Sequence, residues 1–368
     1  MQSKKISKKF KEKAKTVGID FDPLVRSGTY VHQDNISVLS EIATEFKGKV
    51  EIMDTRRAER IYPWVSEYSW KLISPDQDEY TQQAHDDCGG GYFIWVKKGV
   101  KLDLPIQSCI AIKDILNQKL HNIIIIEEGA KANIITGCFK YEDNCAITHI
   151  GCTEFFVAKN AYLNFTMIHN WKENSFVRPR GKAKVGKDGT FVSNYILTSP
   201  VKDIQMNPIA LLEGENSRAS LTSLLFGQKN SKIDIGGRVE LIGNNSCAEI
   251  HAKAIASDSS SLFSRGTIIG NNSNSKGHLE CRGLMLLDSA RITAIPELIA
   301  QKMGAQLSHE AAIGKISQEE ITYLMSRGLS EEKANSVIIR GFLDTKILGL
   351  PKELTEKIKD LIKIKTSI

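Results

Sequence analysis

Polar turn residues recur through most of the chain at nearly constant intervals, and this repeat constrains the fold more than any other feature. From residue 128 to residue 288, turn-forming positions are separated by 13 to 17 residues. Asn and Asp favour turns because their side chains bond nearby backbone groups and tolerate positive φ. The positions are Glu128, Asp143, Asn160, Asn174, Asp188, Asp203, Asn216, Asn230, Asn245, Asp258, Asn272 and Asp288. The repeat predicts about a dozen units, each a short strand followed by a turn.

Between these turns, apolar and polar residues alternate in several intervals. One interval has Ile250, Ala252, Ala254 and Ala256 at one parity and Glu249, His251 and Lys253 at the other. Alternation places the apolar set on one face of a strand. No unit buries that face alone, so stacked units must create a continuous core. The pattern is typical of a β-helix, and regularly spaced short strands also occur in a β-sandwich.

The region before the repeat has a different pattern. Residues 1–90 are expected to be mixed and mostly helical, because apolar residues have helical spacing in Phe10 to Val17 and in Asn35 to Phe46. Cys88-Gly-Gly-Gly91 is expected to be a flexible break. We therefore place a domain boundary there and assign residues 91–315 to the β core.

Residues 316–368 are predicted to be helical. Ser317 and Glu320 match a capping box, and Gly328 is expected to stop the first helix. Ser330 is expected to cap a second helix, whose packed face contains Ala334, Val337 and Ile338. A third helix is expected to begin at Pro351, with Leu354, Ile358, Leu361 and Ile362 as its apolar residues. Such a tail caps the β core or docks a partner.

Composition and charge exclude several classes of protein. No stretch of the 368 residues approaches 18 apolar residues, and no apolar segment of a secretory signal follows the lysine-rich start. The seven cysteines are widely spaced and form no Cys-x-x-Cys pair, which argues against a disulfide framework and a zinc ribbon. Net charge is +6, and the early lysines are expected to form a solvated helix or a frayed end. We expect a cytoplasmic protein without a membrane or nucleic-acid partner.

A thiol, an imidazole and a carboxylate lie near the end of the repeat, at Cys281, His309 and Glu310. Side chains of these three types bind iron. Cys281 also fits a buried core position, because Leu279 and Gly283 share its parity and free cysteines are usually buried. Adjacent residues such as His309 and Glu310 point to opposite faces of a strand. A two-fold interface would let two subunits contribute opposite faces to one site.

Four segments carry a resemblance to a known family: Gly277-His-Leu-Glu-Cys281-Arg-Gly-Leu, Ala294-Ile-Pro-Glu297-Leu, Ser308-His-Glu-Ala-Ala-Ile-Gly-Lys-Ile and Tyr323-Leu-Met-Ser-Arg-Gly-Leu-Ser. They resemble the C-terminal half of SufB and SufD, the scaffold subunits of Suf iron–sulfur cluster assembly. The resemblance covers about Gly91 to Phe342, and the short N-terminal region is similar to the archaeal or minimal-system SufB. It implies a right-handed parallel β-helix core with a C-terminal helical domain.

The resemblance also implies roles for the candidate residues. Cys281 corresponds to the cysteine that accepts sulfur and binds the cluster. The bacterial SufB supplies that cysteine and a glutamate, here Glu310, whereas SufD supplies a histidine at the position of His309. Because this chain has all three residues, we expect a homodimer that assembles a transient 2Fe–2S or 4Fe–4S cluster between its subunits.

Partners follow from the same resemblance. A SufC-like ABC ATPase is expected to dock on Tyr323, Leu324, Met325, Arg327, Gly328 and Leu329. The chain has no phosphate-binding Gly-x4-Gly-Lys-Ser/Thr loop, so we expect ATP hydrolysis in the partner and a scaffold role, not enzymatic activity, here. Sulfur would come from a cysteine desulfurase or another donor and clusters would pass to apo iron–sulfur proteins. An internal cysteine of bacterial SufB is expected to be missing, because the matching run 176–184 has none.

Two other functions are compatible with a stacked β-architecture. One is a β-helix enzyme that acts on polysaccharide, although such enzymes are usually exported and often group acidic residues on one strand face. The other is a structural binding solenoid whose basic N-terminus contacts nucleic acid, which salt-sensitive binding would reveal.

Overall fold

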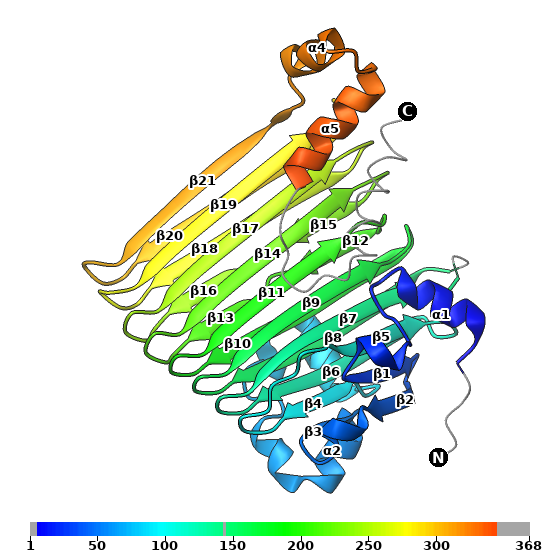
Figure 1. Ribbon diagram of the computed structural model, residues 1–368, viewed down its shortest axis with the longest axis vertical. Helices are drawn as coiled ribbons and strands as arrows, with labels where there is room; N and C mark the ends of the chain where they lie inside the picture. The colour runs from blue at the N-terminus through cyan, green and yellow to red at the C-terminus, as the bar shows by residue number, and fades with distance from the viewer. Residues whose placement is uncertain (1–5, 143–144, 344–368) are drawn as a thin grey trace.

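The computed structural model describes residues 6–142 and 145–343. Its body is a β-solenoid of about eight turns, in which two mainly parallel sheets face each other along the whole length (Figure 1). Helices lie at the N-terminal and C-terminal ends. The predicted mainly β, solenoid fold is therefore confirmed. The predicted turn at Asp143 and the helix predicted from Pro351 lie outside the described residues.

One sheet, sheet A, has the strand order β2-β1-β5-β7-β9-β11-β14-β17-β19-β21 among the described residues. Its pairs are parallel from β1 onwards, and β1–β2 is antiparallel. The strands are β1 (Gly28–Gln33), β2 (Ile36–Ile42), β5 (Ile106–Ile112), β7 (Lys131–Lys140), β9 (Tyr162–Asn170), β11 (Thr190–Leu197), β14 (Arg218–Gly227), β17 (Cys247–Ala256), β19 (Lys276–Met285) and β21 (Gln306–Lys315).

The facing sheet, sheet B, supplies the alternate strand of each coil. It runs from β3 at the N-terminal end, through the paired short strands β12/β13 and β15/β16, to β18 and β20. The strands are β3 (Val50–Asp54), β4 (Tyr92–Val96), β6 (Asn117–Ile126), β8 (Ile147–Val157), β10 (Ser175–Val185), β12 (Asp203–Met206), β13 (Ile209–Leu212), β15 (Lys232–Ile235), β16 (Arg238–Leu241), β18 (Ser261–Gly270) and β20 (Arg291–Ala300).

The register explains the period in the sequence. Ser223, Ala252 and Cys281 are neighbours across β14, β17 and β19, and each is 29 residues from the next. A predicted unit of about 15 residues is therefore half a coil, and two units complete one turn. The described turn positions lie in turns or bends, except Asp203, which begins β12. Asn160, Asp188, Asn216, Asn245 and Asp258 have positive φ, which explains the preference for Asn and Asp there.

The core lies between the sheets. Apolar side chains of one parity from both sheets form one continuous cluster that extends from Tyr30 to Ala290. In β17 this inner set is the predicted one, because Ile250, Ala252, Ala254 and Ala256 are all buried. A second apolar cluster lies on the outer face of sheet A, where it contacts α1 near one end and α5 near the other. Sheet A therefore packs against apolar side chains on both its inner and its outer face.

The N-terminal region contains more strand than predicted. α1 (Lys8–Lys15) confirms the first helical prediction, but the second was wrong, because β2 occupies that segment. β2 pairs with β1 and so extends sheet A, and these ladder hydrogen bonds outweigh the helical spacing of its apolar residues. The remaining helices of the region are α2 (Thr55–Ile61), α3 (Glu79–Asp86), η1 (Pro23–Val25), η2 (Thr44–Phe46), η3 (Pro63–Glu67) and η4 (Pro75–Gln77).

The glycines after Cys88 are buried, in contrast to the expected flexible break. A Cβ on Gly91 would lie 2.0 Å from the backbone oxygen of His121, and the φ of Gly91 is +150°. These glycines therefore permit a close approach of two backbones where the N-terminal region meets the first coil.

The C-terminal helices have the predicted bounds within a few residues. α4 (Gln318–Ser326) follows Ser317, although the Ser317 side chain makes no capping hydrogen bond, and Gly328 has a φ of +92° after the helix. α5 (Glu331–Leu343) begins after Ser330, whose Oγ accepts a hydrogen bond from the backbone N–H of Lys333. Its packed face includes Ala334 and Ile339, whereas Val337, predicted to pack, is exposed.

Candidate functional site

The C-terminal end of the solenoid is open, unlike the rest of its length. β21 is the last strand of sheet A, and β20 extends sheet B beyond β18. Every residue of these two strands is at least partly exposed. Ile299 and Ile313 are exposed apolar side chains on them, and Met303, in the turn that joins them, is 96% exposed. The edges of β20 and β21 are therefore exposed side by side. The described residues leave the end of the core between these two strands uncovered.

Cys281 lies one strand from this open edge. It is on the inner face of β19, belongs to the main core cluster and is 2% exposed. The hydroxyl of Ser264, on β18, donates a hydrogen bond of 3.8 Å to its Sγ. Burial raises the pKa of the Cys281 thiol above its usual value, and the Ser264 bond opposes this in part. The raised pKa favours the neutral, protonated form of this thiol, which lies near the end of the core.

His309 and Glu310 lie on the edge strand β21, and both are exposed. In the β19–β21 register, His309 pairs with Leu279, Glu310 pairs with Glu280, and Ala311 pairs with Cys281. Paired residues of a parallel sheet point to the same side, so His309 shares the inner face with Cys281 while Glu310 points outward. The predicted opposition of His309 and Glu310 within one chain is therefore present.

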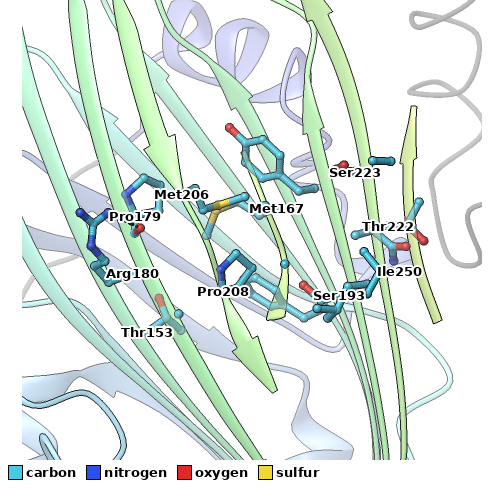
Figure 2. A pocket seen from close by; sticks show the side chains of 18 of the residues that line it. Thr153, Met167, Pro179, Arg180, Ser193, Met206, Pro208, Thr222, Ser223 and Ile250 are labelled. Carbon is cyan, nitrogen blue, oxygen red and sulfur yellow. Dashed lines mark hydrogen bonds between the residues drawn. The ribbon is translucent and has the colours of Figure 1, made fainter. Parts of the chain in front are cut away.

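A cavity lies between the two sheets of the solenoid (Figure 2). It has a volume of about 50 Å³ and is lined by residues from both sheets, among them Thr153, Met167, Tyr195, Met206 and Ala252. Ala252 is the ladder neighbour of Cys281. The cavity therefore ends one strand from the thiol.

Interruptions of sheet B create the room for this cavity. β12 and β13 are separated at Asn207–Pro208, and β15 and β16 at Gly236–Gly237. Gly237 faces the core, because a Cβ there would lie 3.1 Å from Leu221 and 3.7 Å from Ile250. Leu221 and Ile250 of the opposite sheet occupy the space beside Gly237, so a larger residue there would crowd them, and Pro208, Gly236 and Gly237 line the cavity at these interruptions.

A second cysteine, Cys138, faces the interior of the solenoid. Cys138, on β7, is a fully buried member of the main core cluster and is the ladder neighbour of His169. Burial raises its pKa well above the usual value. Cys138, Cys145 and Cys152, seven residues apart in the sequence, are each expected from the sequence to be buried packing cysteines. Cys138 and Cys152 are buried, on the inner side of sheet A and the outer side of sheet B, whereas Cys145 is partly exposed.

Sequence reasoning missed a group of polar residues on the outer face of sheet A, opposite Cys281. His251, on β17, contacts the carboxylates of both Glu249 and Glu280. The outward parity of Glu249 and His251 was visible in the sequence, but their proximity to Glu280 depends on the 29-residue register. Within residues 6–142 and 145–343, no three His, Cys, Asp or Glu side chains already have the geometry that holds a metal ion.

Comparison with known proteins identifies the family. Residues 111–342 match the family model described as "SUF system FeS cluster assembly, SufBD core domain". The chain belongs to the SufBD family. An iron–sulfur cluster assembly SufBD family protein from Archaeoglobus fulgidus is 46% identical over 96% of this chain and 94% of that protein. One from Methanothermobacter thermautotrophicus is 44% identical over 98% of this chain and 88% of that protein. One from Pyrococcus horikoshii is 33% identical over 93% of this chain and 77% of that protein.

The SufBD match extends into the C-terminal helices, where the predicted docking residues lie. Tyr323 and Met325, on α4, are exposed apolar side chains, and Arg327 lies over the Tyr323 ring at 5.3 Å from its centroid. Leu324 and Leu329 are half-buried, and Gly328 is exposed. The helices thus present apolar surface on one side while Ile321 and Ala334 pack on the other. No helix in the described part of the chain has the length and apolar character needed to cross a membrane.

Proposed function

We propose that this chain is a scaffold on which an iron–sulfur cluster is assembled between two copies of the chain. The observation that supports it most is the placement of Cys281 on the inner face, one strand from an open edge that carries His309 and Glu310. Membership of a cluster-assembly family gives iron and sulfur as the cargo. The polysaccharide-enzyme and nucleic-acid alternatives have no comparable support.

The open end is the expected dimer interface. β20 and β21 present strand edges together with the exposed side chains Ile299, Met303 and Ile313. Edge strands pair readily with another chain. A two-fold axis at this end places the inner face of one subunit near the edge of the other. The proposed ligands of each site are Cys281 and Glu310 of one subunit and His309 of its partner, and the dimer has two such sites. Because Cys281 faces inward and Glu310 faces outward within one chain, β21 must twist at the interface to bring Glu310 to the thiol.

The chemistry at this site begins with sulfur. A persulfide donor, R–S–SH, gives its terminal sulfur to the Cys281 thiolate, and the donor leaves as R–S⁻, so that Cys281 becomes a persulfide and no external oxidant is needed. Because the thiol is buried and its pKa is raised, the site must open before the thiolate forms. Iron is then held by sulfur, imidazole and carboxylate. Oxygen and nitrogen ligands hold a 2Fe–2S or 4Fe–4S cluster less firmly than four thiolates, which suits transfer to apo iron–sulfur proteins.

The interior cavity supports an approach of sulfur from inside the solenoid. It ends at Ala252, beside Cys281, and its lining is mostly apolar. Cys138 lies on the inner face further from the open end and is a candidate for an earlier sulfur carrier. A cysteine desulfurase or another persulfide donor in the cytoplasm would supply the sulfur.

A SufC-like ABC ATPase is expected to drive the opening of the site around Cys281. We assign ATPase docking to the C-terminal region, residues 316–368. The proposed contact residues are Tyr323, Leu324, Met325, Arg327, Gly328 and Leu329. Residues 1–90 form the proposed N-terminal region, and residues 91–315 form the proposed β core. α4 follows β21 directly, and Ile339 of α5 belongs to the same outer cluster as Leu284 of β19. Movement of these helices is thereby transmitted to both strands of the site.

Anaerobic reconstitution with iron and sulfide tests the scaffold proposal. The wild-type chain with its ATPase is expected to develop visible iron–thiolate absorption, and Cys281→Ser is expected to lose it. Cys247→Ser is the matched control, because Cys247 is partly exposed and lies on β17, beside β19. Equal absorption in wild type and Cys281→Ser would reject Cys281 as the anchor of the cluster.

A binding measurement tests the ATPase assignment separately. Tyr323→Ala combined with Met325→Ala removes exposed apolar surface without touching the core. The pair is expected to weaken ATPase binding about 10-fold or more, as loss of an aromatic anchor does at interfaces. Leu116→Ala, a similarly exposed apolar position outside residues 316–368, is the control. Unchanged ATPase binding in the α4 variant would move the docking surface elsewhere.

A further inference from the structure

The outer face of sheet A carries a histidine and carboxylate cluster directly behind Cys281. Glu249 and His251 lie on β17, and His278 and Glu280 lie on β19. In the register, Glu249 pairs with His278 and His251 pairs with Glu280. Cys281 has the opposite parity and faces the core. The cluster is therefore separate from the thiol, although it is on the same two strands.

We propose that Glu249, His251 and His278 bind one ferrous ion on this outer face. The pair of Glu249 and His251 already has suitable spacing, since Oε2 of Glu249 lies 3.2 Å from Nε2 of His251. Two donor atoms that are each ~2.1 Å from one metal ion lie about 3 Å apart when they subtend a right angle. The spacing of these two atoms therefore fits two ligands of one ion.

His251 is also oriented from its other ring nitrogen. Its Nδ1 lies 3.1 Å from Oε2 of Glu280, and Glu280 forms an ion pair with Arg282. A carboxylate that accepts Nδ1–H directs the lone pair of Nε2 outward, which is the usual arrangement behind metal-binding histidines.

His278 is also oriented by a hydrogen-bond partner at its Nδ1. Its Nδ1 lies 2.9 Å from the hydroxyl of Ser308 on β21, which makes Nε2 its metal-binding nitrogen. Its ring centroid is 6.3 Å from that of His251. In the described residues no three such donors yet surround one point, so His278 must turn toward Glu249 when the ion binds. His278 is half-buried, and Glu249 is exposed beside it, which leaves room for this rotation.

The donor set points to the metal. Two histidines and one carboxylate with open positions are typical of non-haem ferrous sites. The exposed Glu249 lets an ion enter from solvent. Glu310 is next to Glu280 on the same outer face, so a bound ion lies one strand from a proposed cluster ligand. A role in supplying iron to the cluster rests on the proposed function, but the binding of Fe²⁺ does not.

Anaerobic equilibrium dialysis with Fe²⁺ alone, on the full-length chain, tests the site. The chain with Cys281→Ser is expected to bind Fe²⁺ as wild type does. His251→Ala, His278→Ala and Glu249→Gln are each expected to weaken binding at least ~10-fold, and Glu280→Gln about 10-fold through loss of orientation. His85→Ala is the control, because His85 is exposed and contacts Asp86 far from the cluster. Far-UV circular dichroism of each variant excludes unfolding as the cause.

The outcomes separate this proposal from the proposed function. Equal Fe²⁺ binding in His251→Ala and wild type, or loss of binding in Cys281→Ser alone, would overturn the outer site. Loss in His278→Ala but not in His85→Ala would support it. Cluster absorption that is absent even though this Fe²⁺ site is intact would count against the cluster proposal and leave the outer site standing.

Discussion

The two ends of the solenoid differ in how their side chains are packed and in how much of their surface is exposed. In the N-terminal half of the solenoid the interior is filled by large rings, and Tyr30, Tyr92, His149, His169 and Trp171 are all nearly or fully buried. β1, β2 and β3 extend both sheets there, and α1 covers the outer face. Towards the C-terminal end, after Tyr195, the described core cluster contains aliphatic and small side chains and no aromatic ring, and the last two strands have no buried residue. The packed N-terminal part contributes most to the free energy of unfolding, whereas the exposed C-terminal end, with its ionisable groups, is available to bind a second chain.

The sharpest test of the ring-filled N-terminal half is the removal of its largest core side chain. Trp171 is fully buried and packs on the rings of His149 and His169. Trp171→Ala is expected to lower the free energy of unfolding by about 3–5 kcal/mol, because it leaves a large cavity. Met303→Ala, at the open end, is expected to change it by less than about 0.5 kcal/mol. Chemical denaturation measures both, and similar losses would contradict the contrast between the ends.

Acid should weaken the N-terminal half next. Burial lowers the pKa of His32 to about 4 and that of His149 to about 3, both below the ordinary value of 6.5. A histidine with a lowered folded-state pKa contributes fully above pH 6.5, and the contribution is lost as the pH falls toward the folded value. His32 alone is expected to cost about 2 kcal/mol of stability between pH 7.5 and pH 5. Denaturation of His32→Gln at both pH values should show a smaller acid loss, whereas exposed His85→Gln should show the wild-type loss.

The open end is expected to affect assembly more than stability. Ile313 lies on the edge strand β21 and is exposed. Ile313→Lys should leave the free energy of unfolding within about 0.5 kcal/mol of wild type. It should nevertheless convert a dimer into a monomer in light scattering, because a charge is unfavourable in the core of an interface. Leu24→Lys, at an exposed position near the N-terminal end, is the control and should stay dimeric. A dimeric Ile313→Lys variant would place the interface elsewhere.

The repeating unit of the fold was predictable because its information is local, whereas the choice of a β-helix over a β-sandwich came from the family resemblance. Turn residues at positive φ and alternating apolar residues recur in each half-coil, so spacing alone revealed the unit. The β2 segment was not predictable in this way, because its apolar spacing fits a helix and the strand forms through pairing with β1. The glycines before β4 are similar, since their contact with His121 depends on a distant segment.

The candidate site was predictable only in part. The opposite parity of His309 and Glu310 follows from their adjacency, and the resemblance supplied Cys281. The interior position of Cys138 and the contact between His251 and Glu280 depend on the register between coils, which residue spacing does not reveal. Whether His309 acts across the interface depends on a second chain.

The most direct test of the central claim is a complementation experiment between two variants. Cys281→Ser and His309→Ala are co-expressed with different tags, and the heterodimer is purified through both tags and reconstituted with iron and sulfide. Each homodimer should fail, but the heterodimer keeps one site with an intact Cys281 from one chain and an intact His309 from the other, so it should form about half the wild-type amount of cluster. No cluster in the heterodimer, alongside a normal wild-type control, would contradict a site that is shared between two subunits.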